Sequence, residues 1–310
     1  MTDAGRSRLA AFAGPEARAW LGRIGSLLGL AGVIFVALRL KDYAGQIEFG
    51  AIGAAGYSGL GALAVIYGAS NLLLASGWWR VLRQLDVDIS YGWAVRAYAT
   101  SQLAKYIPGN IFQFAGRQAI GAAAGLGNRQ LAKSTGLELA LLVGCGALFG
   151  PLVLPLIARR LFSPLSPLDA SQLGASLAAE AVFVGLAVLA IWLIGRWGSD
   201  MRAAACRYLA FLAASGVVFV ATFFIAGGRF ELALAPTIAG AYVVAWLVGL
   251  VTPGAPAGIG VREAILLFLL ADLGSPPTIL LAVVLARAVT VLGDLLFYAL
   301  GPFYDRTSRT

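Results

Sequence analysis

Long apolar stretches without charge dominate the chain. Four uncharged runs are each long enough to cross the ~30 Å hydrocarbon core of a bilayer as a helix. These runs are residues 49–79, 139–158, 208–228 and 232–261. With the neighbouring apolar segments they predict six full spans, at about 21–40, 57–79, 135–157, 174–194, 207–226 and 278–300. The pattern therefore predicts an all-α polytopic membrane protein.

Two regions interrupt this pattern of continuous spans. Residues 91–128 contain Pro108-Gly109, and residues 234–271 contain the sequence TPGAPAGIGVRE. Proline and clustered glycine end a helix, and unpaired backbone within lipid is unfavourable unless protein or water surrounds it. The arms beside the breaks are short, since residues 91–104 would form a helix only about 21 Å long. Both regions are predicted to be re-entrant helical hairpins, with eight full spans as the alternative.

The distribution of basic residues predicts the orientation. Residues 1–20 form a cytoplasmic N-terminal segment and residues 301–310 a cytoplasmic tail in this prediction. The loops then expected on the inside carry most of the lysines and arginines, as the positive-inside rule requires. The chain is rich in arginine, alanine and glycine, which suggests a GC-rich bacterial genome. We therefore expect a multi-pass protein of the bacterial inner membrane with both termini in the cytoplasm.

The order of spans and hairpins repeats along the chain. A single membrane domain of residues 21–300 divides into halves at about 21–157 and 174–300, each reading span, span, hairpin, span. The first hairpin would enter from the inside and the second from the outside. This is the inverted-repeat layout of many transporters, whose binding sites lie near the midplane where broken helices meet.

Composition narrows the chemistry. Hydrophobic residues make up 60% of the chain and charged residues 12%, too few charges to cover a soluble protein of this size. The absence of histidine removes the commonest general base and metal ligand. We therefore expect no enzyme activity, no catalytic residues, no metal and no cofactor. The basic residues are scattered between spans, so nucleic acid is not an expected partner.

Lys105 is the strongest candidate at the first break, in the sequence KYIPGNIFQFAGR. An ammonium at a re-entrant tip with free backbone amides would bind phosphate well. Equally, a Lys-Tyr pair could simply reach the headgroup level beside a turn. Arg96 and Arg117 flank this tip and need anionic partners, because charges in a helix bundle usually pair or face a cavity. The acidic candidates are Glu138, Glu180, Glu263 and Asp294, and for Glu180 a structural ion pair is the favoured interpretation.

The second break places charges at the start of a helix. Glu263 would be stabilised there by the helix N-terminus, and the preceding glycines could form an anion-binding concavity beside Arg262. Arg287 and Asp294 lie seven residues apart on one face of the last span and could face the same cavity. A structural role in helix packing is an equal alternative for this pair.

The two break motifs together resemble the membrane domain of the lysylphosphatidylglycerol synthase/flippase family. In that family a K-Y-[IL]-P-G segment precedes a P-G-G-x-G-x-R-E segment at about this distance, and the resemblance covers roughly residues 20 to 300. This chain departs from the pattern at Ala255-Pro256-Ala257, and it has Gln113 where a bulkier aromatic residue or histidine is common. The full-length synthases add a soluble aminoacyl-transferase domain, for which no room follows the last span here, so lysine transfer is not expected.

The resemblance implies a set of substrate-binding residues. These are Lys105, Tyr106, Pro108, Gly109 and Arg117 in the first motif, and Pro253, Gly254, Gly258, Gly260, Arg262 and Glu263 in the second. Asn110 and Gln113 of the first motif are further candidates for substrate binding. Arg96, Glu138, Arg287 and Asp294 are the expected charge partners in the cavity.

The favoured function is translocation of an anionic phospholipid or lipid-linked substrate between leaflets, with membrane lipids as partners. Two hairpins entering from opposite faces would supply a polar path for the headgroup while acyl chains stay in the bilayer. A small-solute secondary transporter is an alternative, since inverted repeats also permit it. An accessory subunit beside a separate synthase or glycosyltransferase is another.

Overall fold

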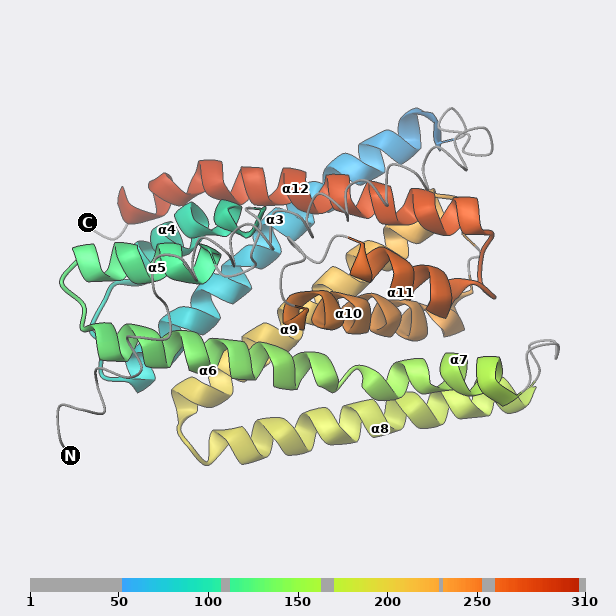
Figure 1. Cartoon of the computed structure of the whole chain (residues 1–310), viewed down its shortest axis with the longest axis horizontal. Coiled ribbons are helices and arrows are strands. Elements are labelled where there is room, and N and C mark those ends of the chain that lie inside the picture. Colours follow the sequence, from blue (N-terminus) through green and yellow to red (C-terminus); the bar gives the residue numbers. More distant parts are fainter. Residues whose placement is uncertain (1–51, 107–111, 163–169, 229–230, 253–259, 307–310) are drawn as a thin grey trace, which may run out of the picture.

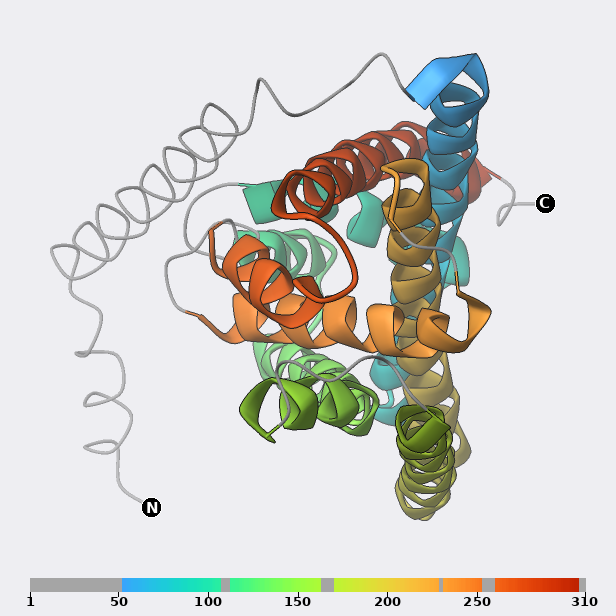
Figure 2. The same ribbon diagram turned by 90° about the vertical axis from the view of Figure 1, so that its right-hand side faces the viewer.

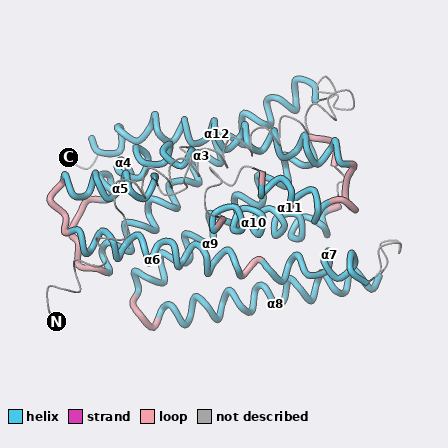
Figure 3. The backbone as a smooth tube through the Cα atoms, viewed as in Figure 1, coloured by secondary structure: helices cyan, strands magenta, loops and turns pink. Residues whose placement is uncertain are grey.

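The regular structure of the described residues is entirely helical (Figure 3). The computed structural model describes residues 52–106, 112–162, 170–228, 231–252 and 260–306. The first half contains α3 (Gly53–Gln84), α4 (Tyr91–Gln102), the 3₁₀ turn η3 (Leu103–Tyr106), α5 (Phe112–Ala123), α6 (Asn128–Ala147) and α7 (Gly150–Phe162). The second half contains α8 (Ala170–Gly195), α9 (Ser199–Ile225), the 3₁₀ turn η4 (Leu232–Leu234), α10 (Ala235–Val251), α11 (Val261–Leu270) and α12 (Pro276–Arg306).

Six helical segments within the described residues are long and apolar enough to cross a membrane. They are Gly53–Gln84, Asn128–Ala158, Gly174–Gly195, Ser199–Ile225, Leu232–Val251 and Pro276–Gly301. The predicted class, an all-α polytopic membrane protein, is therefore confirmed. Five of the segments overlap predicted spans, and the predicted span at 21–40 lies outside the described residues.

The sixth segment, Leu232–Val251, revises the prediction for the second hairpin. Its 20 residues make the first arm of that hairpin long enough to cross a membrane. The sequence stays apolar and free of charge from Leu232 up to the break, so the helix continues to Val251 before the proline and glycine residues stop it. In Figure 2, where α8 is seen nearly end-on, α10 runs across the view, so the two helices are steeply inclined to each other.

Helix pairs form on both sides of the predicted breaks. In each region the two arms pack against each other, α4 against α5 and α10 against α11. The loops that join α4 and α5 to the neighbouring spans lie at the left of Figure 1, whereas the loop from α11 to α12 lies at the right. The two pairs therefore enter the bundle from opposite ends.

The halves are arranged around two antiparallel helices, α3 and α9. The guanidinium of Arg80, near the end of α3, lies 2.7 Å from the Asp200 carboxylate at the start of α9. At the other end, a methyl group on Gly59 would lie 3.4 Å from the side chain of Ile225. Equivalent helices of an inverted repeat run in opposite directions, as these two do.

The helices that pack against α3 and α9 also correspond between the two halves. Helix α12 packs on α3 and α4, and correspondingly α6 packs on α9 and α10. Helix α5 packs on α6 as α11 packs on α12. This packing matches the correspondence that the inverted layout predicts, and residues from both hairpin regions line one cavity.

Candidate functional site

A cavity of about 80 Å³, open at its mouth, lies between the two halves. Its charged and polar lining comes from both of them. The first half contributes Lys105, Tyr106 and Gln113, and the second contributes Arg262, Arg287 and Thr290. Three cations on three different elements, η3, α11 and α12, thus face one space, and this space is the candidate site.

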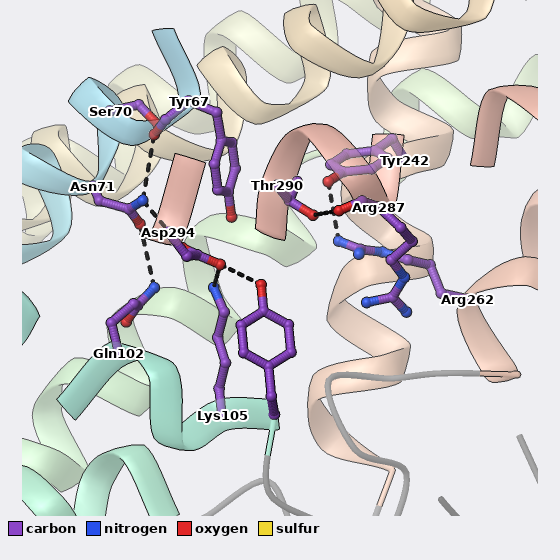
Figure 4. Close-up of polar contacts among 11 residues, drawn as sticks. Tyr67, Ser70, Asn71, Gln102, Lys105, Tyr242, Arg262, Arg287, Thr290 and Asp294 are labelled. Carbon is purple, nitrogen blue, oxygen red and sulfur yellow. Dashed lines mark hydrogen bonds and ion pairs between the residues drawn. The ribbon is translucent and has the colours of Figure 1, made fainter. Parts of the chain in front are cut away.

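Lys105 reaches the cavity because the first hairpin arm tightens before its proline. Helix α4 gives way to the 3₁₀ turn η3, which ends at Tyr106, shortly before Pro108, as expected where a proline prevents the helix from continuing. The Lys105 ammonium lies 2.6 Å from the carboxylate of Asp294, whose side chain is fully buried, and keeps 16% of its own side chain exposed (Figure 4). Lys105 is therefore a largely buried ion-pair partner that lines a cavity.

Asp294 accepts hydrogen bonds from two uncharged side chains as well. The Tyr106 hydroxyl donates to the same carboxylate oxygen as Lys105, and the Asn71 amide donates to the other oxygen over 3.2 Å. Gln102 donates in turn to the carbonyl oxygen of Asn71 (Figure 4). The carboxylate thus lies behind the cavity wall, held by groups from α3 and η3.

Arg262 is the cation with the fewest partners. Its side chain is 6% exposed, it donates to the Tyr242 hydroxyl over 3.1 Å, and its guanidinium lies 4.6 Å from the centre of the same ring. Among the described residues it forms no ion pair with a carboxylate, and its Nε has no hydrogen-bond partner. A buried guanidinium without an acidic partner is costly, so its position at the cavity suits an anionic ligand.

Glu263 begins helix α11 beside Arg262. Gly260 has a φ of 87°, a left-handed conformation that favours glycine, and its backbone N–H donates to the Glu263 carboxylate in the first turn. The other carboxylate oxygen lies 3.1 Å from Nη2 of Arg287. Glu263 is therefore held by the helix N-terminus, as predicted, and neutralises Arg287 across the α11–α12 interface.

Arg117 belongs to a separate buried network. Its guanidinium lies 2.8 Å from the carboxylate of Glu138 on α6, and both side chains are almost completely buried. The Tyr98 hydroxyl donates to the same carboxylate oxygen. Arg117 packs over the rings of Tyr98 and Phe114, and these two rings line the cavity. The Arg117–Glu138 pair thus lies behind an aromatic wall of the site.

The three cations of the first hairpin region, Arg96, Lys105 and Arg117, do not form one cluster in the structure. Lys105 pairs with Asp294 and Arg117 with Glu138. Arg96 is exposed on α4 and does not line the cavity, so its predicted role as a cavity charge is not supported. The reason is helical rotation, since position 96 lies on the outward stripe of α4 with position 100, away from the buried stripe.

Several predicted residues lie outside the described ranges. They are Pro108, Gly109, Asn110, Pro253, Gly254 and Gly258. Gln113 and Tyr106 line the cavity, and their role in substrate binding stays a prediction. Glu180 is half-exposed on α8, and no ion pair joins it to another described residue.

Sequence reasoning missed the neutral side chains that complete the site. Asn71, Gln102, Tyr98 and Tyr242 bind the charged groups. Asn71 carried a usable signal, because an amide in the middle of an uncharged span seeks a partner inside the bundle. The tyrosines carried none, since aromatic residues are frequent throughout this chain.

The charges around the cavity suit binding of an anion. Three cations meet two carboxylates around the cavity, Asp294 and Glu263, which leaves one positive charge without a counterpart. No group of three potential metal ligands occurs among the residues that the structure describes. No family model matches this chain, and no curated protein matches it significantly.

Proposed function

We propose that this protein moves an anionic phospholipid or a lipid-linked anionic substrate between the leaflets of a membrane. The observation that carries the proposal is Arg262, a buried guanidinium that faces the cavity and forms no ion pair with a described carboxylate. A phosphate group would supply the missing charge, and it would reach Lys105 and Arg287 in the same space.

The apolar part of the cavity supports an amphiphilic substrate. Leu74, Leu142, Phe211 and Leu250 line it beside the cations. A headgroup could contact the cations while the glycerol and proximal acyl carbons contact these side chains. A small, fully hydrated solute would gain little from the apolar lining, and for this reason we favour a lipid over a soluble metabolite.

The arrangement of the two halves supports transport over catalysis. Antiparallel α3 and α9 and hairpins that enter from opposite ends are features of proteins that expose one site alternately to two sides. We place the protein in the bacterial inner membrane with cytoplasmic termini, and we relate it to the lysylphosphatidylglycerol synthase/flippase membrane domains. A separate synthase or glycosyltransferase would then supply the lipid.

The test is lipid translocation in reconstituted vesicles. Phosphatidylcholine vesicles carrying a trace of fluorescent phosphatidylglycerol would be prepared with wild type, Lys105→Ala, Arg262→Gln and the control Arg202→Gln. Arg202 is exposed near the start of α9, so its variant should behave as wild type. We expect accelerated translocation by wild type, and a loss of at least about tenfold for the two cavity variants, since each removes a charge-assisted contact.

Two results would contradict the proposal. If wild type does not accelerate any fluorescent anionic lipid, lipid translocation is wrong, and uptake of small anions into the same vesicles tests the alternative transporter. If Arg262→Gln translocates lipid as fast as wild type, the headgroup does not use this cavity.

A further inference from the structure

The Lys105 ammonium is within reach of two possible anionic partners, the carboxylate of Asp294 and an anion in the cavity. The Lys105 ammonium lines the cavity and at the same time contacts Asp294, whose side chain is fully buried. Asp294 itself does not line the cavity. An anion that enters the cavity therefore meets Lys105 directly and competes with Asp294 for it.

The groups that face Asp294 show what remains when Lys105 turns to an anion. Its own hydrogen-bond donors would then be Tyr106 and Asn71, which are uncharged. Helix α3 also presents the phenol of Tyr67, and α4 contributes the amide of Gln102 through Asn71. The nearby cations are Arg262 of α11, which faces the cavity, and Arg287 of α12, which is paired with Glu263.

A buried carboxylate that loses its cation is unfavourable, and protonation is the usual relief. A proton on Asp294 would leave a neutral acid that still receives hydrogen bonds from Asn71 and Tyr106. Glu263 differs, because the backbone N–H of Gly260 at the start of its own helix donates to it, and this donor stays in place even where Arg287 also turns to the anion. Asp294 is thus the carboxylate whose charge depends on the ligand.

We propose that Asp294 exchanges its ion pair with Lys105 for a proton when an anionic headgroup enters the cavity, so that translocation of the headgroup carries a proton. The exchange balances: a paired ammonium and carboxylate, one anion and one proton become an ammonium paired with the anion and a neutral carboxylic acid. The proton comes from water in the cavity and returns to water when the anion leaves. This inference rests on the proposed function and adds its driving force, a pH difference across the membrane.

The first experiment measures binding in detergent. Dihexanoyl phosphatidylglycerol, whose phosphodiester keeps one negative charge near neutral pH, would be titrated into purified protein over a range of pH. Because binding takes up a proton, the apparent affinity of wild type should rise about tenfold for each pH unit of acidification. In weakly buffered solution a pH dye should report the same uptake.

Two variants separate Asp294 from other carboxylates. Asp294→Asn mimics the protonated acid, so it should bind the lipid without proton uptake and with an affinity that does not change with pH. Asp88→Asn is the control, since Asp88 is exposed in the loop after α3, and it should keep the pH dependence of wild type. If Asp294→Asn does not fold, the wild-type measurement still decides, because an affinity independent of pH would overturn the inference.

The second experiment uses vesicles with a pH difference. Wild type should move fluorescent phosphatidylglycerol faster away from the acidic side than toward it. Translocation that ignores the pH difference would overturn proton coupling and leave the proposed function standing. If wild type moves no anionic lipid at all, the proposed function is wrong and the inference falls with it.

Discussion

Gly68 of α3 and Gly293 of α12 lie so close that neither position can hold a larger residue without movement of a helix. A methyl group on Gly68 would lie 2.9 Å from the carbonyl oxygen of Gly293, and a methyl group on Gly293 would lie 2.7 Å from the carbonyl oxygen of Ala64. Small residues permit such backbone contact between membrane helices. This contact immediately precedes Asp294 and brings it within reach of Asn71.

Gly293→Ala should therefore destabilise the protein. The methyl group would push α12 from α3, and we expect a loss of about 1–3 kcal/mol in the free energy of unfolding, the usual cost of overpacking. Thermal unfolding in detergent, followed by tryptophan fluorescence, measures it. Gly144→Ala is the matched control, because a methyl group there meets no atom within 4 Å, and it should be neutral or slightly stabilising. Equal stability of the two variants would show that α3 and α12 are not in close contact.

The buried pair of Arg117 and Glu138 predicts a non-additive result. Arg117→Met alone leaves the Glu138 carboxylate buried without its cation, and we expect a loss of about 3–5 kcal/mol. Glu138→Leu alone should cost a similar amount. The double variant removes both charges and should be markedly more stable than the sum of the single effects predicts. Additive losses in the same unfolding assay would mean that the two side chains do not interact.

Glu263→Gln should strengthen anion binding while weakening the fold. The variant keeps the shape of the side chain but removes the charge that neutralises Arg287, so the cavity gains net positive charge. We expect up to about tenfold tighter binding of dihexanoyl phosphatidylglycerol and a lower unfolding temperature. Weaker binding at unchanged stability would instead indicate that Glu263 contacts the ligand, for example an amine of its headgroup.

Orientation can be tested with single cysteines. In a background without Cys145 and Cys206, cysteines would replace Asp88 or Glu231, which are both exposed and lie in loops at opposite ends of the bundle. If the basic loops face the cytoplasm, an impermeant maleimide should label Glu231→Cys in intact cells and Asp88→Cys only after lysis. The reverse pattern would invert the predicted topology.

The two halves share a local arrangement that their sequences do not reveal. Tyr98 of α4 lies under Arg117 of α5, and Tyr242 of α10 lies under Arg262 of α11. In the first half the arginine is neutralised by a glutamate on the following span. In the second half the following span carries Arg287, which pairs with Glu263 instead. The inverted layout was predictable from the order of spans. The different pairing of arginine and glutamate in the two halves was not.

The class of protein, the positions of most spans and the two helix breaks could all be predicted from the order of residues along the chain. These properties depend on local chemistry: the transfer of apolar side chains into lipid is set by composition along a short window, and proline or glycine ends a helix wherever it stands. The same reasoning located Lys105, Arg262 and Glu263 beside the breaks.

Tertiary structure decided which charges meet. Lys105 pairs with Asp294 of the other half, whereas Arg96, on the same hairpin arm, is exposed on the outside of the bundle. A cross-helix pair depends on the rotation and separation of elements that are distant in sequence, and here the contact of Gly68 with Gly293 fixes the part of α12 that carries Asp294 against α3. Such relations between helices leave no signal in local hydropathy, so only the folded chain shows that three cations share one cavity.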